Sequence, residues 1–295
     1  MHIKISTGEK IFNVFNYIFM ILLALTMIIP FLRIISLSFS GSDAIISGNV
    51  ILFPKQFTLG SYENIIKSGQ VFSSFKNTIL VTLTGTILNM LATILCAYPL
   101  SKKRLRGGGI FKSLILFTML FSGGLIPTFL LVKSLGLADT YGALWLPSLV
   151  SVYNMLVLIS FFKGIPESLE ESAAIDGAND LLILFRIILP LSMPALSTLT
   201  LFYAVGWWNE YYNTMIFINS GEKYTMTVRL MQMMRNLSDS MRTISDEGAI
   251  DRNQLLTPES VKAATIVLTI VPIMLTYPFL QKYFVKGVML GSVKG

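Results

Sequence analysis

Ring-bearing and hydrogen-bonding side chains follow one another at Trp207, Trp208, Asn209, Glu210 and Tyr211. Indole and phenol rings offer flat apolar faces, and the amide and carboxylate can bond hydroxyl groups. Such a cluster could bind the rings and hydroxyls of a carbohydrate. Two alternatives remain open, because Trp and Tyr are also enriched at membrane interfaces, and Glu210 could instead pair with a cation of a partner protein.

Side chains that could perform catalysis or bind a metal are scarce. The chain has one histidine, His2, and one cysteine, Cys96, which excludes an intrachain disulfide and a His/Cys metal cluster. We expect Cys96 to be buried. The sequence contains no Walker A phosphate loop, no His-Glu-x-x-His and no Gly-x-Ser-x-Gly motif. We therefore expect a chain that is not an enzyme and has no catalytic residue, no metal site and no cofactor of its own.

A second polar segment, residues 163–190, separates two long apolar stretches. Pro166 suits the first turn of a helix, and the acidic residues after it complement the helix dipole. Gly177 can adopt the left-handed conformation that ends a helix. Asn179 or Asp180 can cap a second helix, and Pro190 marks a bend into the next apolar stretch. The segment is therefore predicted to form a helix–turn–helix elbow.

The first helix of this elbow, residues 167–177, combines acidic and small side chains. Small residues let another surface approach closely, and carboxylates can pair with cations on that surface. Physical reasoning alone leaves two interpretations open: a docking element for another protein, or a loop helix packed under the membrane domain. The candidate docking residues are Glu167, Glu170, Glu171, Ala173, Ala174, Asp176, Gly177 and Pro190.

Composition defines the kind of molecule that must position these residues. The chain has 295 residues, of which 53% are hydrophobic and 13% charged, whereas soluble domains have about 25% charged residues. We therefore predict an all-α polytopic membrane protein, because backbone groups in lipid need internal hydrogen-bond partners. Asn89 is expected to join two of its helices. A single transmembrane domain, 1–295, would have six spans at about 12–37, 78–100, 110–132, 141–162, 191–218 and 263–284.

The connection 101–112 indicates how the chain is oriented. It carries five basic residues and no acidic one: Lys102, Lys103, Arg104, Arg106 and Lys112. The positive-inside rule places such a loop in the cytoplasm. With six spans, both termini and the 163–190 segment share that side, and the loops 40–72 and 219–257 lie outside. We read the net charge of +7 as membrane topology and expect no nucleic-acid partner.

The spacing within the elbow resembles a known family motif. Glu171–Ala173, then Gly177 after three residues, Ile187 after nine more, and Leu189–Pro190 match the "EAA" motif of ABC importer permeases. The single departure is Ser172, where that family usually has alanine. The six-span plan and the ending of the chain look like the second permease of maltose-type carbohydrate importers, closest to the complex-oligosaccharide branch.

This resemblance implies a type I ABC importer permease fold, in which residues 167–177 form the coupling helix. Glu171 would pair with a basic residue of an ATPase, and Gly177 would permit the turn. It also implies an oligosaccharide substrate, the bacterial cytoplasmic membrane as location, and alternating access as mechanism. The implied partners are membrane lipid, a second permease subunit related by a pseudo-twofold axis, two ATPase subunits that hold ATP and Mg, and an extracellular solute-binding protein.

Other functions remain open at this stage. An ABC permease could carry a non-sugar solute such as a polyamine or phosphonate, and the acidic Glu210 would suit a cation. A secondary transporter or channel is a further alternative, although no internal repeat is evident. An intramembrane enzyme is disfavoured by the missing catalytic motifs.

Overall fold

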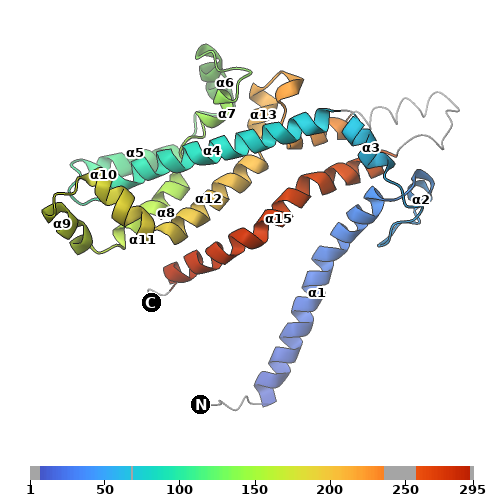
Figure 1. Cartoon of the computed structure of the whole chain (residues 1–295), viewed down its shortest axis with the longest axis horizontal. Coiled ribbons are helices and arrows are strands. Elements are labelled where there is room, and N and C mark those ends of the chain that lie inside the picture. Colours follow the sequence, from blue (N-terminus) through green and yellow to red (C-terminus); the bar gives the residue numbers. More distant parts are fainter. Residues whose placement is uncertain (1–6, 68, 236–256, 293–295) are drawn as a thin grey trace. The chain divides into compact units, whose positions relative to one another are not determined.

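The computed structural model describes residues 7–67, 69–235 and 257–292. Every regular element in these ranges is a helix, so the predicted all-α class is confirmed (Figure 1). Residues 1–6, 293–295 and 236–256, the last within the predicted outer loop, lie outside the described residues. The first elements are α1 (Thr7–Ser38), α2 (Ser42–Ile46), α3 (Gly60–Lys67), α4 (Gln70–Ser101), α5 (Gly108–Leu120), α6 (Leu125–Ser134), α7 (Gly142–Trp145) and α8 (Val152–Lys163). The later elements are α9 (Glu167–Ile175), α10 (Asp180–Ile183), the π-helix η1 (Leu184–Ile188), α11 (Leu189–Leu191), α12 (Met193–Trp208), α13 (Tyr212–Phe217), the 3₁₀ turn η2 (Gly221–Lys223) and α15 (Pro258–Ser292).

The chain divides into two compact units, which are described separately. Unit 1 comprises residues 1–70 and 230–272, and unit 2 comprises residues 71–229 and 273–295. The main helix of unit 1 is α1, whose most apolar 18-residue window has a mean hydropathy of 2.6 and no buried residue. Beyond α1 the chain turns back on itself, and the Tyr62 hydroxyl donates a hydrogen bond of 2.9 Å to the Ser38 hydroxyl.

The candidate docking and path residues all lie in unit 2, which is built around α4. One face of α4 carries small or polar side chains at intervals of three or four residues, which is the spacing of a helix face. Such side chains let helix backbones approach closely within a membrane. The buried residues of this face are Ser74, Thr78, Thr82, Gly85, Thr86, Asn89 and Thr93.

Asn89 joins three segments of unit 2. Its amide donates hydrogen bonds of 2.6 and 3.0 Å to the carbonyls of Ser148 and Leu149. Its side-chain oxygen accepts a 2.6 Å hydrogen bond from Nε1 of Trp207 on α12. The prediction that Asn89 holds helices together is confirmed.

Cys96 is exposed, so the expectation of a buried thiol was wrong. At this end of α4 the buried face shifts to Ala97, Tyr98 and Ser101, which are each at most 8% exposed. Packing of other segments against these three residues leaves Cys96 outside the core.

Two apolar cores fill unit 2. Core I gathers side chains from the carboxyl end of α4, from α8, from α10 with η1, and from α12: Ala97, Tyr98, Leu100, Met155, Leu158, Ile159, Phe162, Ile183, Leu184, Ile188, Leu196 and Leu199. Core II gathers side chains from α4, α6, α7, α12 and the α13 region: Val81, Val132, Ala143, Leu144, Trp207, Phe217 and Ile218.

Several predicted spans are interrupted helices. Residues 110–132 form α5 and α6, which meet at 111°, and Asp180–Leu191 meets Met193–Trp208 at 84°. Residues 141–162 contain the short α7, an irregular stretch and the 12-residue α8. Within the described ranges, three helices are long and apolar enough to span a membrane, or up to five if each bent pair is one span. The count of six spans stays a prediction.

Glycine accounts for one of these breaks. Gly124, between α5 and α6, has φ 86° and ψ 172°, a conformation that side chains other than hydrogen rarely permit. The chain therefore leaves the α5 direction at this point and begins α6 at a new angle. Sequence-based counting of apolar residues over 110–132 cannot detect such a change of direction.

Candidate functional site

The predicted elbow is present at residues 166–191. Helix α9 ends at Ile175, and Gly177, two residues later, has a φ of +85°. The Gly177 N–H donates to the Ala174 carbonyl at 3.0 Å, and the Ala178 N–H donates to the Ala173 carbonyl at 2.9 Å. This pair of bonds is the stop that a left-handed glycine gives to a helix. Asn179 then begins α10, because its side-chain oxygen accepts a 2.8 Å hydrogen bond from the Leu182 N–H.

The two arms of the elbow differ in burial. Helix α9 has no buried residue. In contrast, Ile183, Leu184 and Ile188 of the second arm are at most 4% exposed and belong to core I. A displacement of α9 would therefore be transmitted through this anchored arm into the packed interior of unit 2.

Three ion pairs tie the elbow to the basic loop that follows α4. Lys102 pairs with Glu170, and both side chains are less than one-fifth exposed. Lys103 pairs with Glu167 at 3.0 Å.

The third pair joins Arg104 to Asp180. The Asp180 carboxylate accepts a hydrogen bond from the guanidinium and raises the pKa of Arg104. Figure 1 shows the elbow beside the carboxyl end of α4, where this loop begins. The basic loop and the elbow therefore lie at the same end of unit 2, as the predicted topology requires.

The other candidate docking residues differ in what they offer to a partner. Glu171 is exposed, and within the described residues its carboxylate forms no ion pair and accepts no hydrogen bond. Ala173 packs partly against core I. Ala174, Asp176 and Gly177 are exposed.

Pro190 lies in the first turn of α11, whereas the 84° bend occurs at Ser192, between Leu191 and Met193. The expected bend was therefore placed two residues too early. Sequence reasoning also missed Ile175, which is 86% exposed at the end of α9. An apolar side chain next to Asp176 and Gly177, at the tip of a polar helix, is the signal that could have identified it.

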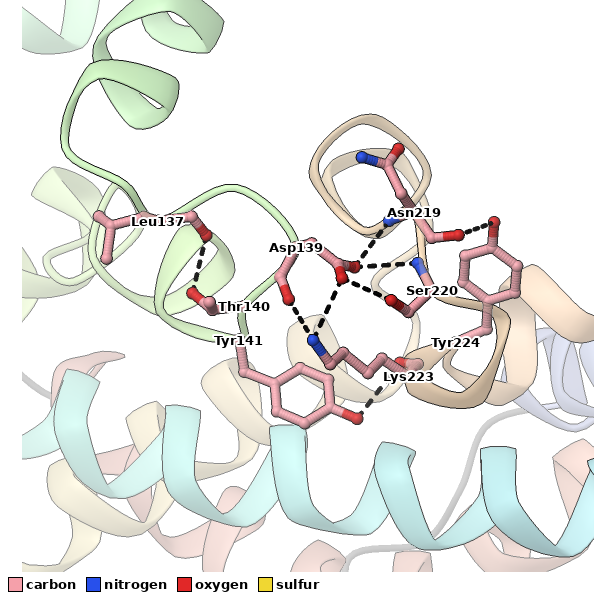
Figure 2. A network of polar contacts seen from close by, with 8 residues as sticks. All are labelled: Leu137, Asp139, Thr140, Tyr141, Asn219, Ser220, Lys223 and Tyr224. Atoms are coloured by element: carbon pink, nitrogen blue, oxygen red, sulfur yellow. Dashed lines mark hydrogen bonds and ion pairs between the residues drawn. The ribbon is translucent and has the colours of Figure 1, made fainter.

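A separate polar network lies around Asp139, which follows α6 (Figure 2). Its carboxylate accepts hydrogen bonds of 2.9 Å from each of the N–H groups of Asn219 and Ser220, and one of 2.5 Å from the Ser220 hydroxyl. The Lys223 ammonium lies 3.2 Å away. These donors, with the Ser220 hydroxyl first, hold the pKa of the Asp139 carboxyl well below its usual range.

The same network reaches the beginning of α4. The Tyr141 hydroxyl donates to the Lys223 carbonyl at 3.3 Å (Figure 2). The Asn77 amide donates to the carbonyls of Glu222 and Tyr224 at 2.6 and 3.1 Å. Residues 77 and 101 are separated by about 36 Å along a helix that rises 1.5 Å per residue. This separation is similar to the thickness of a bilayer core, about 30 Å.

The five predicted path residues lie at the end of α12 and in the break that separates it from α13. Trp207 is 5% exposed and packs over Gly85, where an added Cβ would lie 2.5 Å from its ring. Trp208 is half-buried and meets the Phe75 ring edge-on at 6.0 Å. Asn209 is exposed, but its amide donates to the Val205 carbonyl at 2.9 Å.

Glu210 and Tyr211 form the break itself and are half-buried. One oxygen of the Glu210 carboxylate accepts a 2.8 Å hydrogen bond from the Asn213 N–H, and the other lies 3.2 Å from the Asn213 amide. Glu210 therefore satisfies an N–H group in the first turn of α13, as a capping side chain does, while Tyr211 occupies the N-cap position itself.

A family model described as "binding-protein-dependent transport system inner membrane component" matches residues 90–290. The chain belongs to this family. Membership makes the chain an inner-membrane component of a transport system that works with a binding protein, and a stand-alone transporter does not fit this description. It also confirms the resemblance that the elbow motif indicated.

Individual relatives agree with this family. The chain is 42% identical to the polygalacturonan/rhamnogalacturonan transport system permease protein YtcP of Bacillus subtilis, over 97% of the chain and 99% of that relative. It is 40% identical to protein LplC of the same organism, over 98% and 97%. Among solved structures, a chain of a bacterial ABC transporter that imports the acidic polysaccharide alginate aligns with a TM-score of 0.85 and 33% identity, covering 95% of this chain and 98% of that one.

The alginate importer establishes the fold of this family member. A TM-score of 0.85 over nearly the full length means that the helices follow the same path, so the expected ABC importer permease fold is confirmed. The interrupted helices of unit 2 are thus part of a permease fold. Irregular backbone at membrane depth is tolerated only where protein covers it or where it lines a water-filled cavity.

Proposed function

We propose that this permease carries an oligosaccharide into the cell by alternating access, driven by two separate ATPase subunits that hold ATP and Mg. An extracellular binding protein would deliver the sugar, and a second permease would complete the pathway. The observation that carries this proposal is the exposed arm α9, which follows the EAA spacing and is joined to core I through α10 and η1.

In this proposal α9 is the element that an ATPase subunit grips. Glu171 is the carboxylate available to a basic residue of the ATPase, since Glu167 and Glu170 already pair with Lys103 and Lys102. Ala174 and Ile175 would lie against the ATPase surface beside it. Asp176 and Gly177 would form the turn, and Pro190 would stiffen the second arm.

The proposed orientation places α9 and both termini in the cytoplasm and the Asp139 network outside. It rests on the basic charge of the loop 101–112. It also rests on two sets of polar contacts at opposite ends of α4: the ion pairs between the basic loop and the elbow, and the Asp139 network. The six predicted spans, with the cytoplasmic segment 163–190 and the outer loops 40–72 and 219–257, belong to this proposal as one permease domain.

The substrate path is proposed to pass the break between α12 and α13. Broken helices near the bilayer midplane form the binding sites of many transporters. The Trp208 and Tyr211 rings and the Asn209 amide are the groups that could meet a sugar. Glu210 would shape the break through Asn213, and Trp207 would support it from within core II.

An oligosaccharide is favoured over a polyamine or phosphonate by the relatives. One acts in polygalacturonan and rhamnogalacturonan transport, and the aligned importer takes up alginate. Acidic oligosaccharides are therefore the first substrates to test. Uptake of a galacturonate oligosaccharide and of spermidine, measured in cells with and without this gene, separates the two classes.

The docking role of α9 is tested by Glu171→Lys in the assembled transporter. Loss of a buried charge pair at an interface costs about 2 kcal/mol or more, so we expect ATPase retention to fall by about thirtyfold or more. The measurement is the ATPase that copurifies with the permease, together with ATP hydrolysis stimulated by the loaded binding protein. Glu63→Lys, an exposed charge reversal in unit 1, is the matched control. Unchanged retention in Glu171→Lys would disprove the docking role.

A further inference from the structure

A pocket of about 510 Å³ lies beside the elbow, at the carboxyl end of α4. Its lining comes from α4, from the loop 102–106 and from the second arm of the elbow. All of these segments belong to unit 2. The docking arm α9 contributes no side chain to this lining.

Part of the pocket lining is apolar. Leu95 and Pro99 of α4 belong to it, together with Leu181 and Leu184. Leu95 is 54% exposed and lies within the predicted span 78–100. An apolar chain could therefore lie against these side chains where the predicted span ends.

The polar part of the lining is mostly cationic. It consists of Lys102, Arg104 and Arg106, and Asp180 is the one carboxylate in the lining. Lys102 and Arg104 have their ion pairs with the elbow, but Arg106 has none among the described residues. The pocket therefore has an excess of positive charge where the predicted span ends.

Tyr98 lines the pocket and carries a polar group that no described residue satisfies. Its side chain is 7% exposed, and its hydroxyl is buried without a hydrogen-bond partner among the described residues. The Lys102 ammonium lies 4.2 Å from its ring centroid. Buried hydroxyls are normally satisfied, so this group points to an acceptor that the chain itself does not supply.

We propose that this pocket binds the phosphate headgroup of an anionic phospholipid of the cytoplasmic leaflet. The Tyr98 hydroxyl would donate a hydrogen bond to a phosphate oxygen, and Arg106 would form an ion pair with the same phosphate. An acyl chain would lie along Leu95. Basic pockets between helices on the cytoplasmic side are a recurring form of lipid headgroup site. The apolar part of the lining favours a lipid over a soluble phosphate, because a soluble phosphate has no acyl chain to bury against it.

The test measures lipid retention by the delipidated full chain in detergent, using native mass spectrometry. Dioleoylphosphatidylglycerol is titrated against dioleoylphosphatidylcholine. One cation near the surface contributes about fivefold to the binding of an anionic lipid. Arg106→Gln should therefore lower retention of the anionic lipid by about fivefold. Tyr98→Phe removes a hydrogen bond to a charged group and should lower it by about tenfold. Both changes should leave retention of the zwitterionic lipid unchanged.

Two matched variants control for the chemistry of each change. Arg186→Gln removes an exposed cation from the second arm of the elbow, and Tyr153→Phe removes an exposed hydroxyl. Neither side chain lines the pocket. Both should retain the anionic lipid at the level of the unmodified chain. Equal retention by all four variants, or equal retention of both lipids by the unmodified chain, would overturn the proposal. Full displacement by glycerol 3-phosphate would assign the pocket to a soluble phosphate and would overturn it as well.

Discussion

At the scale of single residues, Gly177 determines how the elbow turns after α9. Its φ of +85° suits glycine, and an added Cβ would meet no atom within 4 Å. Any cost of substitution is therefore a backbone cost, about 1–2 kcal/mol for a residue other than glycine, asparagine or aspartate. The sequence predicted this conformation because a glycine after a helix of small and acidic residues is a common helix stop.

We expect Gly177→Val to reduce stimulated ATP hydrolysis of the assembled transporter and Gly177→Asn to retain most of it. Asparagine tolerates the left-handed conformation, whereas a β-branched residue does not. Gly206→Ala, near the end of α12 with open space around it, should have little effect. Equal activity of the Val and Asn variants would show that the turn is not required.

Asp139 gives a prediction about pH. Its pKa is held low in the folded protein, mainly by the Ser220 hydroxyl and N–H. Because the pKa is lower in the folded than in the unfolded chain, ionised Asp139 adds to the free energy of unfolding. This contribution is complete above the pKa of the unfolded chain, about 3.9, and is lost progressively as the pH falls below that value. Thermal unfolding of the unmodified chain should therefore lose this contribution only below about pH 4. The difference from Asp139→Asn should be constant from pH 5 to 8 and shrink below pH 4; a difference that changes near neutral pH would contradict this account.

At the scale of elements, contacts between distant segments separate what the sequence could predict from what it could not. The elbow depends on neighbours in sequence, so Pro166, Gly177 and Asn179 were sufficient to predict it. The pairing of Lys102 with Glu170 joins residues 68 positions apart. It depends on how α4, α8 and α10 pack, which local patterns do not encode.

The aromatic cluster shows the same limit. Trp207 and Trp208 are adjacent in sequence, and either could have been assigned to a binding surface. Packing decides between them, because Gly85 on α4 leaves room for only one indole. Trp207 fills that room, and Trp208 is left half-buried.

We expect Gly85→Ala to destabilise the permease by about 1–3 kcal/mol, which is the usual cost of overpacking. The new methyl group would lie 2.5 Å from the Trp207 ring. Thermal unfolding of the purified chain measures the effect, and Gly206→Ala is the control with an equal change in size. If Gly85→Ala alone unfolds at the unmodified temperature, the contact does not limit stability.

At the scale of the whole molecule, the proposed orientation can be tested with single cysteines. In a Cys96→Ala background, Glu222→Cys should react with a membrane-impermeant maleimide in intact spheroplasts. Ser168→Cys on α9 should react only after permeabilisation. The Glu222 carbonyl bonds Asn77 near the beginning of α4, whereas Glu167, next to Ser168, pairs with Lys103 just beyond the end of α4. Both residues are exposed, so access to reagent depends on the side of the membrane. The reverse pattern would invert the predicted topology.

The three ion pairs between the 102–104 loop and the elbow have an evolutionary consequence. A mutation that removes one charge leaves its partner unmatched, so tolerated changes at positions 102, 103 and 104 should be accompanied by changes at 170, 167 and 180. Co-variation of this kind is a signature of spatial contact. The basic loop is thus subject to two selective pressures at once, one from membrane insertion and one from its acidic neighbours. Drift at these sites should be slower than in basic loops that serve topology alone.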